Sequence, residues 1–328
     1  MIGIRARVRR AAGRVLRFAR EQRIRWQQPR SAPITTVWTR AEAAAPAHGF
    51  DGERAFDLLR AQCELGPRFP GSEAHGRMPE WLMERLRAGC DEVAVQRWDQ
   101  RVARGPGAGR AFAMTNVFGM IRGSDSAPDE PADVLLCAHW DTRPVADQDR
   151  DPSRRALPVP GANDGASGVA VLLELARVLG ARRPRRTVAI GLWDGEDLGE
   201  YYYGARLFAR FAGRAHARRW RARRGILLDM VGKDGLCCAT ELHSLHAAPA
   251  LWAEIHDSAA AVGAGAHFGG PRIAINDDHV FLNRAGIPTV LLIDYAYPQW
   301  HTTEDTPERC SPHSLQIVGD VLVHWLAR

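Results

Sequence analysis

Acidic and histidine side chains follow four short apolar segments of the chain, at residues 134–138, 187–193, 226–228 and 289–293. Apolar runs of this length are typical of buried strands, and parallel strands bring their carboxyl ends to one edge of a sheet. Histidine nitrogens and carboxylate oxygens are ligands that zinc takes in proteins. The sequence therefore predicts one metal site at this edge. Its candidate residues are His139, Asp141, Glu196, Asp197, Asp229 and His301.

Asp164 is a further candidate ligand, because it lies in the small-residue stretch 161–168, GANDGASG. Small side chains let the backbone turn tightly and leave room for a metal ion beside the carboxylate. Glu196 and Asp197 are adjacent on a predicted loop, so their side chains can point in different directions. One of them can then bind metal while the other acts as a general base. A single such acid is more often a helix cap or turn residue, and it is the repetition at successive strand ends that favours a site.

The elements that must position these residues alternate between strand and helix. Helices are predicted over 168–179, 203–211, 249–262, 278–284 and 312–326. Before them, apolar periodicity predicts helices over 51–65 and 78–90, then two strands at 92–98 and 114–121 joined by a glycine-rich turn. This order predicts an α/β fold of three layers, with helices on both faces of a central, mostly parallel mixed sheet.

The chain divides by composition into a tail and one catalytic domain. Residues 1–48 form a predicted Arg-rich tail and linker, with 31–50 expected as linker or loose helix, and residues 49–328 form the domain. Residues 1–30 hold ten arginines and one glutamate, so they contribute +9 to a net charge of +6 and the remainder is close to −3. The basic character therefore belongs to the tail, which we interpret as a solvated extension, and no nucleic-acid partner is expected.

Localisation and assembly are left open by the sequence. No run of 18 apolar residues exists, so no transmembrane segment is expected. The apolar residues of the tail never form the 7–15-residue block of a secretory signal, which makes the cytoplasm the default and leaves export open. Six scattered cysteines show neither a disulfide framework nor a zinc-ribbon spacing. Nothing indicates an oligomeric state.

The motifs also resemble a known family. They are Gly66-Pro67-Arg68, Pro70-Gly71-Ser72, the element 139–141, the stretch 163–168, Asp194-Gly195-Glu196-Asp197, Leu228-Asp229 and His301-Thr302. In this order they are similar to the zinc aminopeptidase-like metallopeptidases over about residues 50–328. Within that family the chain looks most like the bacterial-type glutaminyl cyclases (glutaminyl-peptide cyclotransferases).

Three features carry the resemblance to the cyclase branch. The acidic pair is Glu196-Asp197, where the two-zinc aminopeptidases usually have two glutamates. The segment before the last strand reads Asp277-Asp278-His279, where the peptidases usually have Ser-Asp-His. The final histidine follows Trp300, where the peptidases usually have tyrosine.

The cyclase resemblance implies roles for individual residues. One zinc ion would be bound by Asp164, Asp197 and His301, with Glu196 as the acid–base. Asp229 and Asp277 would form a hydrogen-bonded acidic pair near the leaving group. Trp300 would line the pocket, and His139 would support the site without binding metal. Their positions in the sequence make Tyr201 and Trp140 further pocket candidates, although Trp140 is more typical of the core or the site wall than of a substrate contact. Asp141 and His279 are further supporting candidates. The substrate would be the N-terminal glutamine of a peptide or protein, cyclised to pyroglutamate with loss of ammonia.

The alternative is a two-zinc aminopeptidase that removes N-terminal residues from peptides. In that case Asp164 would bridge two zinc ions, with His139 and Asp229 completing one site, and with Asp197 and His301 completing the other. Glu196 would deprotonate a bridging water. All these residues are present, so the sequence permits both activities. A noncatalytic binding role is disfavoured, because both a base and a full ligand set are retained.

Overall fold

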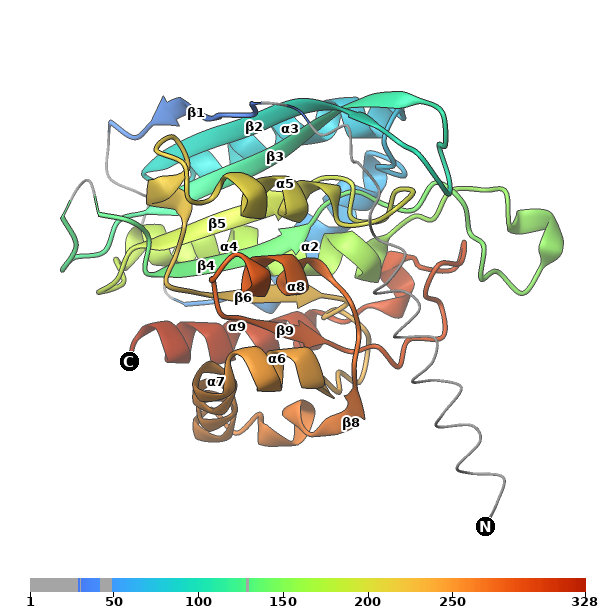
Figure 1. Ribbon diagram of the computed structural model, residues 1–328. Helices are drawn as coiled ribbons and strands as arrows, with labels where there is room; N and C mark the ends of the chain where they lie inside the picture. Colours follow the sequence, from blue (N-terminus) through green and yellow to red (C-terminus); the bar gives the residue numbers. More distant parts are fainter. Residues whose placement is uncertain (1–28, 30, 42–48, 128–129) are drawn as a thin grey trace, which may run out of the picture. The chain divides into compact units, whose positions relative to one another are not determined.

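A computed structural model describes residues 29, 31–41, 49–127 and 130–328 of the chain. Its centre is a seven-stranded sheet with the order β1-β2-β3-β5-β4-β6-β9 (Figure 1). The strands of this sheet are β1 Ile34–Thr39, β2 Glu92–Arg101, β3 Ala111–Ile121, β4 Val134–His139, β5 Val188–Trp193, β6 Arg224–Asp229 and β9 Thr289–Ile293. Two short strands, β7 Ala239–Glu241 and β8 Gly270–Ile273, pair in a separate small sheet.

The sheet is mixed, and the directions of its strands determine the edge at which the site lies. Strand β4 pairs in parallel with β5 and β6, and β6 pairs in parallel with β9. The remaining pairs, β1 with β2, β2 with β3 and β3 with β5, are antiparallel. Five strands therefore run in one direction, and only β1 and β3 oppose them. Because β4, β5, β6 and β9 are parallel neighbours, their carboxyl ends meet at one edge, where α/β sheets bind ligands.

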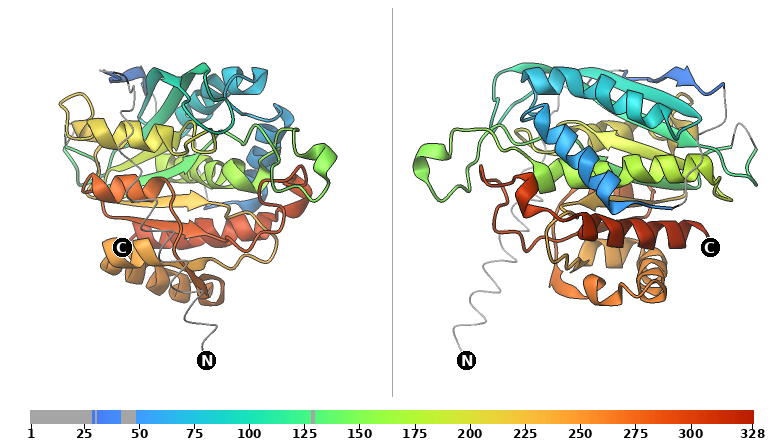
Figure 2. Two further views of the ribbon diagram at one scale, coloured as in Figure 1. Left: turned by 45° about the vertical axis from the view of Figure 1, so that its right-hand side comes forward. Right: turned by 180° about the vertical axis from the view of Figure 1, so that it is seen from behind.

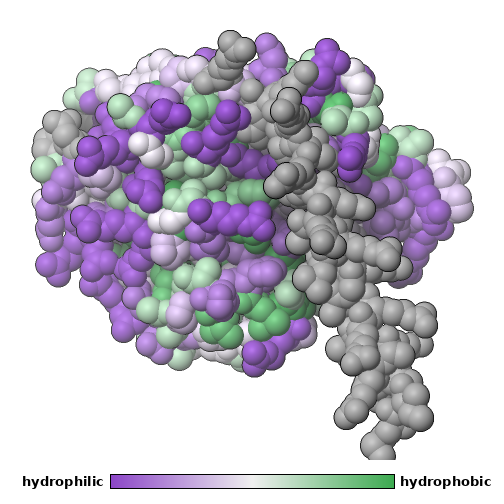
Figure 3. Space-filling view, viewed as in Figure 1, coloured by the Kyte–Doolittle hydropathy of each residue, from purple (hydrophilic) through white to green (hydrophobic). Residues whose placement is uncertain are grey.

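Helices cover both faces of the sheet, which gives the three predicted layers (Figure 2). One buried core joins the sheet to α2, α3, α4, α7 and α9, and a second core joins the opposite face to α5 and α8. Hydrophilic side chains cover most of the face over α5 and α8 (Figure 3). The helices are α2 Gly52–Glu64, α3 Glu73–Arg87, α4 Ser167–Ala181, α5 Tyr203–Phe211, α6 Leu242–Ala247, α7 Pro249–Ala261, α8 Asp278–Arg284 and α9 Pro312–Leu326.

Helix α4 is the most deeply buried of these, with twelve of its fifteen residues buried. Each fully buried leucine or valine in it stabilises the fold by about 1.5–3 kcal/mol. Its first turn lies directly against β6: a Cβ added at Gly168 would meet the Leu228 carbonyl oxygen at 2.5 Å. Glycine is therefore required there, and the close approach brings the segment before α4 to the edge of the sheet.

Most predicted elements agree with the structure, and two predictions were wrong. The segment expected as linker or loose helix at 31–50 contains strand β1, which pairs with β2, so the sheet begins before residue 49. Helix α3 begins at Glu73, earlier than the predicted residue 78, because Ser72 caps it by accepting a hydrogen bond from the His75 amide. Strand β7, strand β8 and helix α6 were not predicted. The Arg-rich tail lies outside the described residues.

Within the described residues, no helix is both long enough and apolar enough to cross a membrane.

Candidate functional site

The predicted ligands meet at the carboxyl edge of the sheet. His139 and Asp229 are the last residues of β4 and β6, and Asp197 and His301 lie in the loops after β5 and β9. Asp164 reaches the same edge from the turn of residues 162–166 before α4. Except for the partly exposed Asp229, these side chains are buried. The fold thus brings together residues that are up to 162 positions apart in sequence.

Two groups of side chains could each hold a metal ion, and they share Asp164. In both groups, one ligand atom from each residue lies within 4.8 Å of the others. In the first group, His301 Nε2 lies 3.1 Å from Asp197 Oδ1 and 3.6 Å from Asp164 Oδ2. In the second, His139 Nε2 lies 3.1 Å from Asp164 Oδ1 and 3.3 Å from Asp229 Oδ1.

The donor set fits a divalent cation such as zinc. Imidazole nitrogens and carboxylate oxygens are ordinary zinc ligands. Asp164 Oδ2 is buried and has no hydrogen-bond partner among the described residues, as expected of an oxygen that binds a metal ion. Burial and the nearby charge of Asp197 raise the pKa of Asp164 to about 7. A bound cation would offset this repulsion and keep the carboxylates ionised.

Asp305 holds the Asp164 turn in place. Its carboxylate accepts hydrogen bonds from the amides of Asn163, at 2.8 Å, and Asp164, at 3.1 Å, and from the Tyr297 hydroxyl, at 2.8 Å. The turn therefore depends on a loop more than 140 residues away. Asp305 was not identified from the sequence, because an isolated acid in a loop carries no local signal.

Asp141 holds the loop that carries the acidic pair. Its carboxylate accepts hydrogen bonds from the amides of Glu196, at 2.9 Å, and Asp197, at 3.2 Å. The same carboxylate lies 3.6 Å from His139 Nδ1, the ring nitrogen opposite the one that faces the ligands. Asp141 therefore contacts both an imidazole and the loop of the acidic pair, which are contacts of the kind that orient metal ligands.

Glu196 lies beside the ligands but belongs to neither ligand group. It is partly buried, and burial together with the neighbouring carboxylates of Asp197 and Asp277 raises its pKa well above the usual range for glutamate. A carboxyl group with a raised pKa can both take and return a proton near neutral pH. This environment suits an acid–base residue.

Asp277 and Asp278 add two more carboxyl groups to this cluster. Asp277 caps α8, with one oxygen accepting the Asp278 amide at 2.5 Å, while its other oxygen has no partner among the described residues. Burial and the charge of Asp229 raise the pKa of Asp277 well above its usual value. Burial raises the pKa of Asp278 to about 8. No direct hydrogen bond joins Asp277 to Asp229, so their predicted pairing stays a prediction.

Arg143 and Asp147 form a second support that the sequence did not reveal. The buried Arg143 guanidinium donates two hydrogen bonds to Asp147, at 2.8 and 2.7 Å, and lies 3.6 Å from Asp197 Oδ1. Asp147 Oδ1 lies 3.5 Å from His301 Nδ1. Such a contact fixes the orientation of an imidazole whose other nitrogen faces a metal. Arg143 stands in the stretch Asp141-Thr142-Arg143-Pro144, which resembles the bacterial-type cyclases, but the resemblance gave no indication of its contacts.

The predicted pocket residues have different environments. Trp300 stacks on His301 with ring centroids 3.8 Å apart, and the exposed Tyr295 lies 5.8 Å from Trp300. Tyr201 lies under the guanidinium of Arg143, at 5.3 Å. Trp140 is fully buried and donates its indole N–H to the Thr115 carbonyl, at 3.2 Å. This corrects the assignment of Trp140 to the substrate pocket, because its ring belongs to the core and presents no surface to a ligand.

His279 lies apart from the two ligand groups. It is fully buried, and its Nε2 lies 3.1 Å from Glu241 Oε2. Burial opposes the charge of Glu241, but hydrogen bonds from His279 and from the amides of His243 and Ser244 lower the pKa of Glu241 to about 2. The pair therefore links the start of α6 to α8, the helix that Asp277 caps, and the supporting role of His279 stays a prediction.

Glu241→Gln is expected to weaken the acid dependence of stability. The pKa of Glu241 is about 2 in the fold and near 4.5 when unfolded, so its ionisation stabilises the protein above pH 4.5. This contribution, on the order of 3 kcal/mol, is lost as pH falls from 4.5 towards 2. Urea unfolding of metal-free protein between pH 6 and 3 measures it, with the exposed Glu53→Gln as the control. Parallel curves for wild type and Glu241→Gln would refute the assignment.

Backbone strain is concentrated around the site. Among the described residues, four that are not glycine have φ in the left-handed region: Tyr201 at 64°, Tyr202 at 62°, Met230 at 47° and His301 at 54°. All four lie in the loops that follow β5, β6 and β9. Side chains with a Cβ rarely adopt this conformation, and such residues cluster where the surrounding structure holds a functional geometry.

Comparison with known proteins shows which family the chain is similar to. The family model described as peptidase family M28 matches residues 116–326, which include every ligand candidate. The crystal structure of Bacteroides thetaiotaomicron glutaminyl cyclase bound to N-acetylhistamine is 31% identical, with a TM-score of 0.77, over 86% of this chain and 99% of that chain. A leucine aminopeptidase precursor from Bacteroides thetaiotaomicron is also 31% identical, with a TM-score of 0.74, over 86% of this chain and 98% of that one.

Among curated sequences, a probable zinc metalloprotease of Leptosphaeria maculans is 38% identical over 139 residues. These residues are 39% of this chain and 29% of that protein, so the match spans less than a third of the relative's length. The family model, by contrast, covers more than half of the chain, and the similar structures are matched over almost their whole length. The chain therefore belongs to peptidase family M28.

Proposed function

We propose that this protein is a zinc-dependent glutaminyl-peptide cyclotransferase, which converts the N-terminal glutamine of a peptide or protein to pyroglutamate. The observation that carries the proposal is the position of Asp277. Its carboxyl group is buried and has one oxygen without a partner among the described residues. The charge of Asp229 raises the pKa of Asp277, and Asp277 in turn raises the pKa of Glu196. A peptidase mechanism has no step that uses such an acid. A cyclase, in contrast, must remove a proton from the attacking nitrogen and add one to the departing nitrogen.

Asp164, Asp197 and His301 would hold the zinc ion. When bound, zinc supplies a Lewis acid that polarises the side-chain carbonyl of the substrate glutamine and stabilises the negative charge on its oxygen. Trp300, stacked on His301, and the exposed Tyr295 offer aromatic surface beside this position for the glutamine side chain. The site's task is to fold that side chain back onto the substrate's own amine, which is catalysis by proximity.

Proton transfer in this reaction falls to Glu196. The α-nitrogen of the substrate forms a bond to the side-chain carbonyl carbon, and Glu196 takes the proton that this nitrogen loses. Glu196 then gives a proton to the departing amide nitrogen, the carbon–nitrogen bond breaks, and ammonia leaves. A carboxyl group of raised pKa suits both transfers. Asp277 and Asp229 lie beside this path and would accept hydrogen bonds from the leaving nitrogen.

The test follows the mass of a short peptide that begins with glutamine. Incubation with the purified enzyme should reduce the mass by about 17 Da, which is one ammonia, with no shorter product and with loss of activity in a chelator. Release of free N-terminal residues from peptides beginning with leucine or alanine would instead establish an aminopeptidase. N-Acetylhistamine, bound in the Bacteroides thetaiotaomicron enzyme, should compete with the glutamine peptide.

One observation favours the aminopeptidase as a second candidate. His139, Asp164 and Asp229 form the second potential ligand group, and it shares Asp164 with the first. Two metal ions held in this way could activate a bridging water for attack on a peptide bond. The product of the peptide assay separates the two candidates, because cyclisation leaves the chain length unchanged.

Asp277→Ala is expected to lower kcat for cyclisation roughly 10- to 100-fold, the effect of losing one or two hydrogen bonds to a charged group. Zinc content should not change, since Asp277 lies outside both ligand groups. Asp257→Ala, which alters an exposed aspartate on α7, is the matched control. If Asp277→Ala leaves cyclisation intact, the buried position of Asp277 no longer supports a cyclase.

A further inference from the structure

Tyr202 connects the two segments that carry the proposed catalytic acids. Its amide donates a hydrogen bond to the carbonyl of Glu196, at 3.0 Å. Its hydroxyl donates a hydrogen bond to the carbonyl of Asn276, at 2.7 Å. Asn276 immediately precedes Asp277. One residue thus reaches the backbone of both acid-bearing loops, although these loops are about 80 positions apart in sequence.

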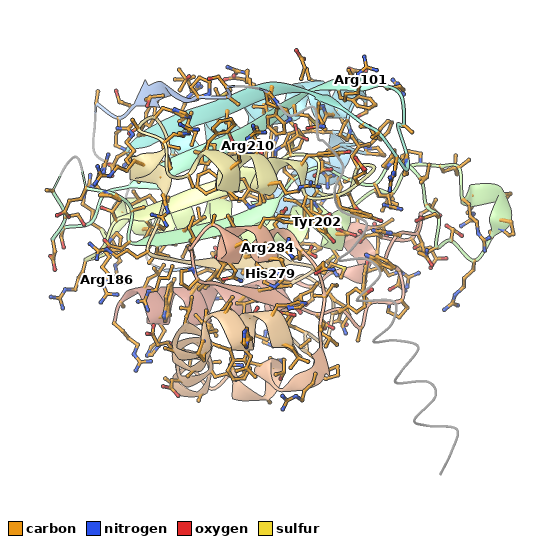
Figure 4. All side chains as sticks on the ribbon, in the orientation of Figure 1. Arg101, Arg186, Tyr202, Arg210, His279 and Arg284 are labelled. Carbon is orange, nitrogen blue, oxygen red and sulfur yellow. The ribbon has the colours of Figure 1, made fainter. Side chains whose placement is uncertain are left out.

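Ring contacts strengthen this connection. The ring of Tyr202 lies 5.5 Å from that of Phe281 in α8, and 5.5 Å from that of Tyr201 on its own loop. Figure 4 shows Tyr202 in the region between α5 and α8. Ring contacts at this distance add to the stability of a packed aromatic side chain. Tyr202 therefore contacts the segment before α8 through its hydroxyl and α8 itself through its ring.

The backbone of Tyr202 is held in an unfavourable conformation to make these contacts. Tyr202 has φ 62° and ψ 27° at the N-cap of α5, and the preceding Tyr201 is also left-handed. Glycine would adopt this conformation without steric cost. An aromatic residue there indicates that its side chain supplies something that the turn alone does not need.

We propose that Tyr202 is a positioning residue that sets the distance between Glu196 and Asp277. For its effect on cyclisation this inference rests on the proposed function. Glu196 follows β5 and Asp277 caps α8, so no shared helix or strand holds the two acids in register. The hydroxyl and ring of Tyr202 supply that link. Misplacing a catalytic group lowers the rate of the chemical step more than it weakens substrate binding.

The mildest test removes only the hydroxyl. Tyr202→Phe should lower kcat roughly fivefold, the rate equivalent of one neutral hydrogen bond, with KM and zinc content unchanged. Tyr203→Phe is the matched control, because it removes a neighbouring tyrosine hydroxyl that lies 3.5 Å from Glu200 and so bonds within its own loop. A change in KM alone, or an equal loss in both variants, would overturn the assignment.

Two further variants separate positioning from turn formation. If Tyr202 served only the turn, Tyr202→Gly would keep kcat and raise the melting temperature, because glycine relieves the strain. Positioning predicts instead a larger loss of kcat than in Tyr202→Phe. In an Asp277→Ala background, Tyr202→Phe should cause no further loss of kcat, since the group being positioned is absent. Independent, additive losses would contradict the proposal.

Hydrogen exchange tests the same link without any catalytic assay. Removing the hydroxyl bond should speed amide exchange in peptides spanning residues 276–284, and Tyr203→Phe should not. This readout holds even if the wild-type enzyme proves not to be a cyclase, so failure of the inference and failure of the proposed function give different results. Unchanged exchange in Tyr202→Phe would show that Tyr202 does not hold α8.

Discussion

Glu196→Gln is expected to lower kcat for cyclisation of N-terminal glutamine by roughly 10²–10⁴-fold, the usual contribution of a general acid–base. Glutamine has nearly the same shape, but its amide can neither take the proton from the substrate amine nor return it to the leaving nitrogen. Binding of the peptide and of zinc should change little, because Glu196 belongs to neither ligand group. The measurements are steady-state kinetics and zinc content by mass spectrometry.

Glu200→Gln provides the control for this substitution. Glu200 lies four residues further along the same loop, near the Tyr203 hydroxyl, and is absent from the ligand groups. It should keep near wild-type activity. Retention of full activity by Glu196→Gln would remove Glu196 as the acid–base and leave the raised pKa of its carboxyl without a catalytic meaning. Loss of zinc together with activity would point instead to a direct ligand.

His301→Ala is expected to weaken zinc binding by more than the roughly 10- to 100-fold that loss of an outer-shell partner costs. Its Nε2 faces Asp197 and Asp164, and its removal leaves only two carboxylates in that group. Asp147→Asn, which removes the carboxylate facing the other ring nitrogen, should fall within the 10- to 100-fold range. The exposed His246→Ala serves as control. Competition with a chromophoric chelator measures all four affinities.

His139→Ala extends this experiment to the number of metal ions. With a single zinc on Asp164, Asp197 and His301, the variant keeps one equivalent, as the wild type does. With two ions, the count falls from two to one, because His139 belongs only to the second ligand group. Unchanged zinc binding in His301→Ala would exclude the first group as the zinc site, whatever His139→Ala shows.

Local patterns in the sequence determined where the strands end and which residues follow them. Strand β9, helix α5, helix α8 and helix α9 have the boundaries that apolar periodicity predicts. The apolar runs of β4, β5 and β6 are buried on both faces, which makes them recognisable without structural information. Because parallel strands end at one edge, the sequence was sufficient to predict that His139, Asp229 and His301 meet there.

The supporting contacts were decided only by the tertiary structure. Asp305 binds the Asp164 turn, and Arg143 holds Asp147 against His301, through contacts that leave no periodic trace in the sequence. Strand β1 was missed because an exposed edge strand lacks a continuous apolar run and is stabilised by pairing with β2.

Whether an aromatic residue faces the core or the site also depends on distant packing, and Trp140 and Tyr202 illustrate both outcomes. Trp140 follows the buried strand β4 and turns its ring into the core, whereas Tyr202 reaches across to the segment before α8. Both are aromatic residues in loops beside catalytic candidates, so residue type and spacing cannot separate them. Strand ends follow from short-range apolar patterning, but side-chain partners follow from which loops the completed sheet brings together.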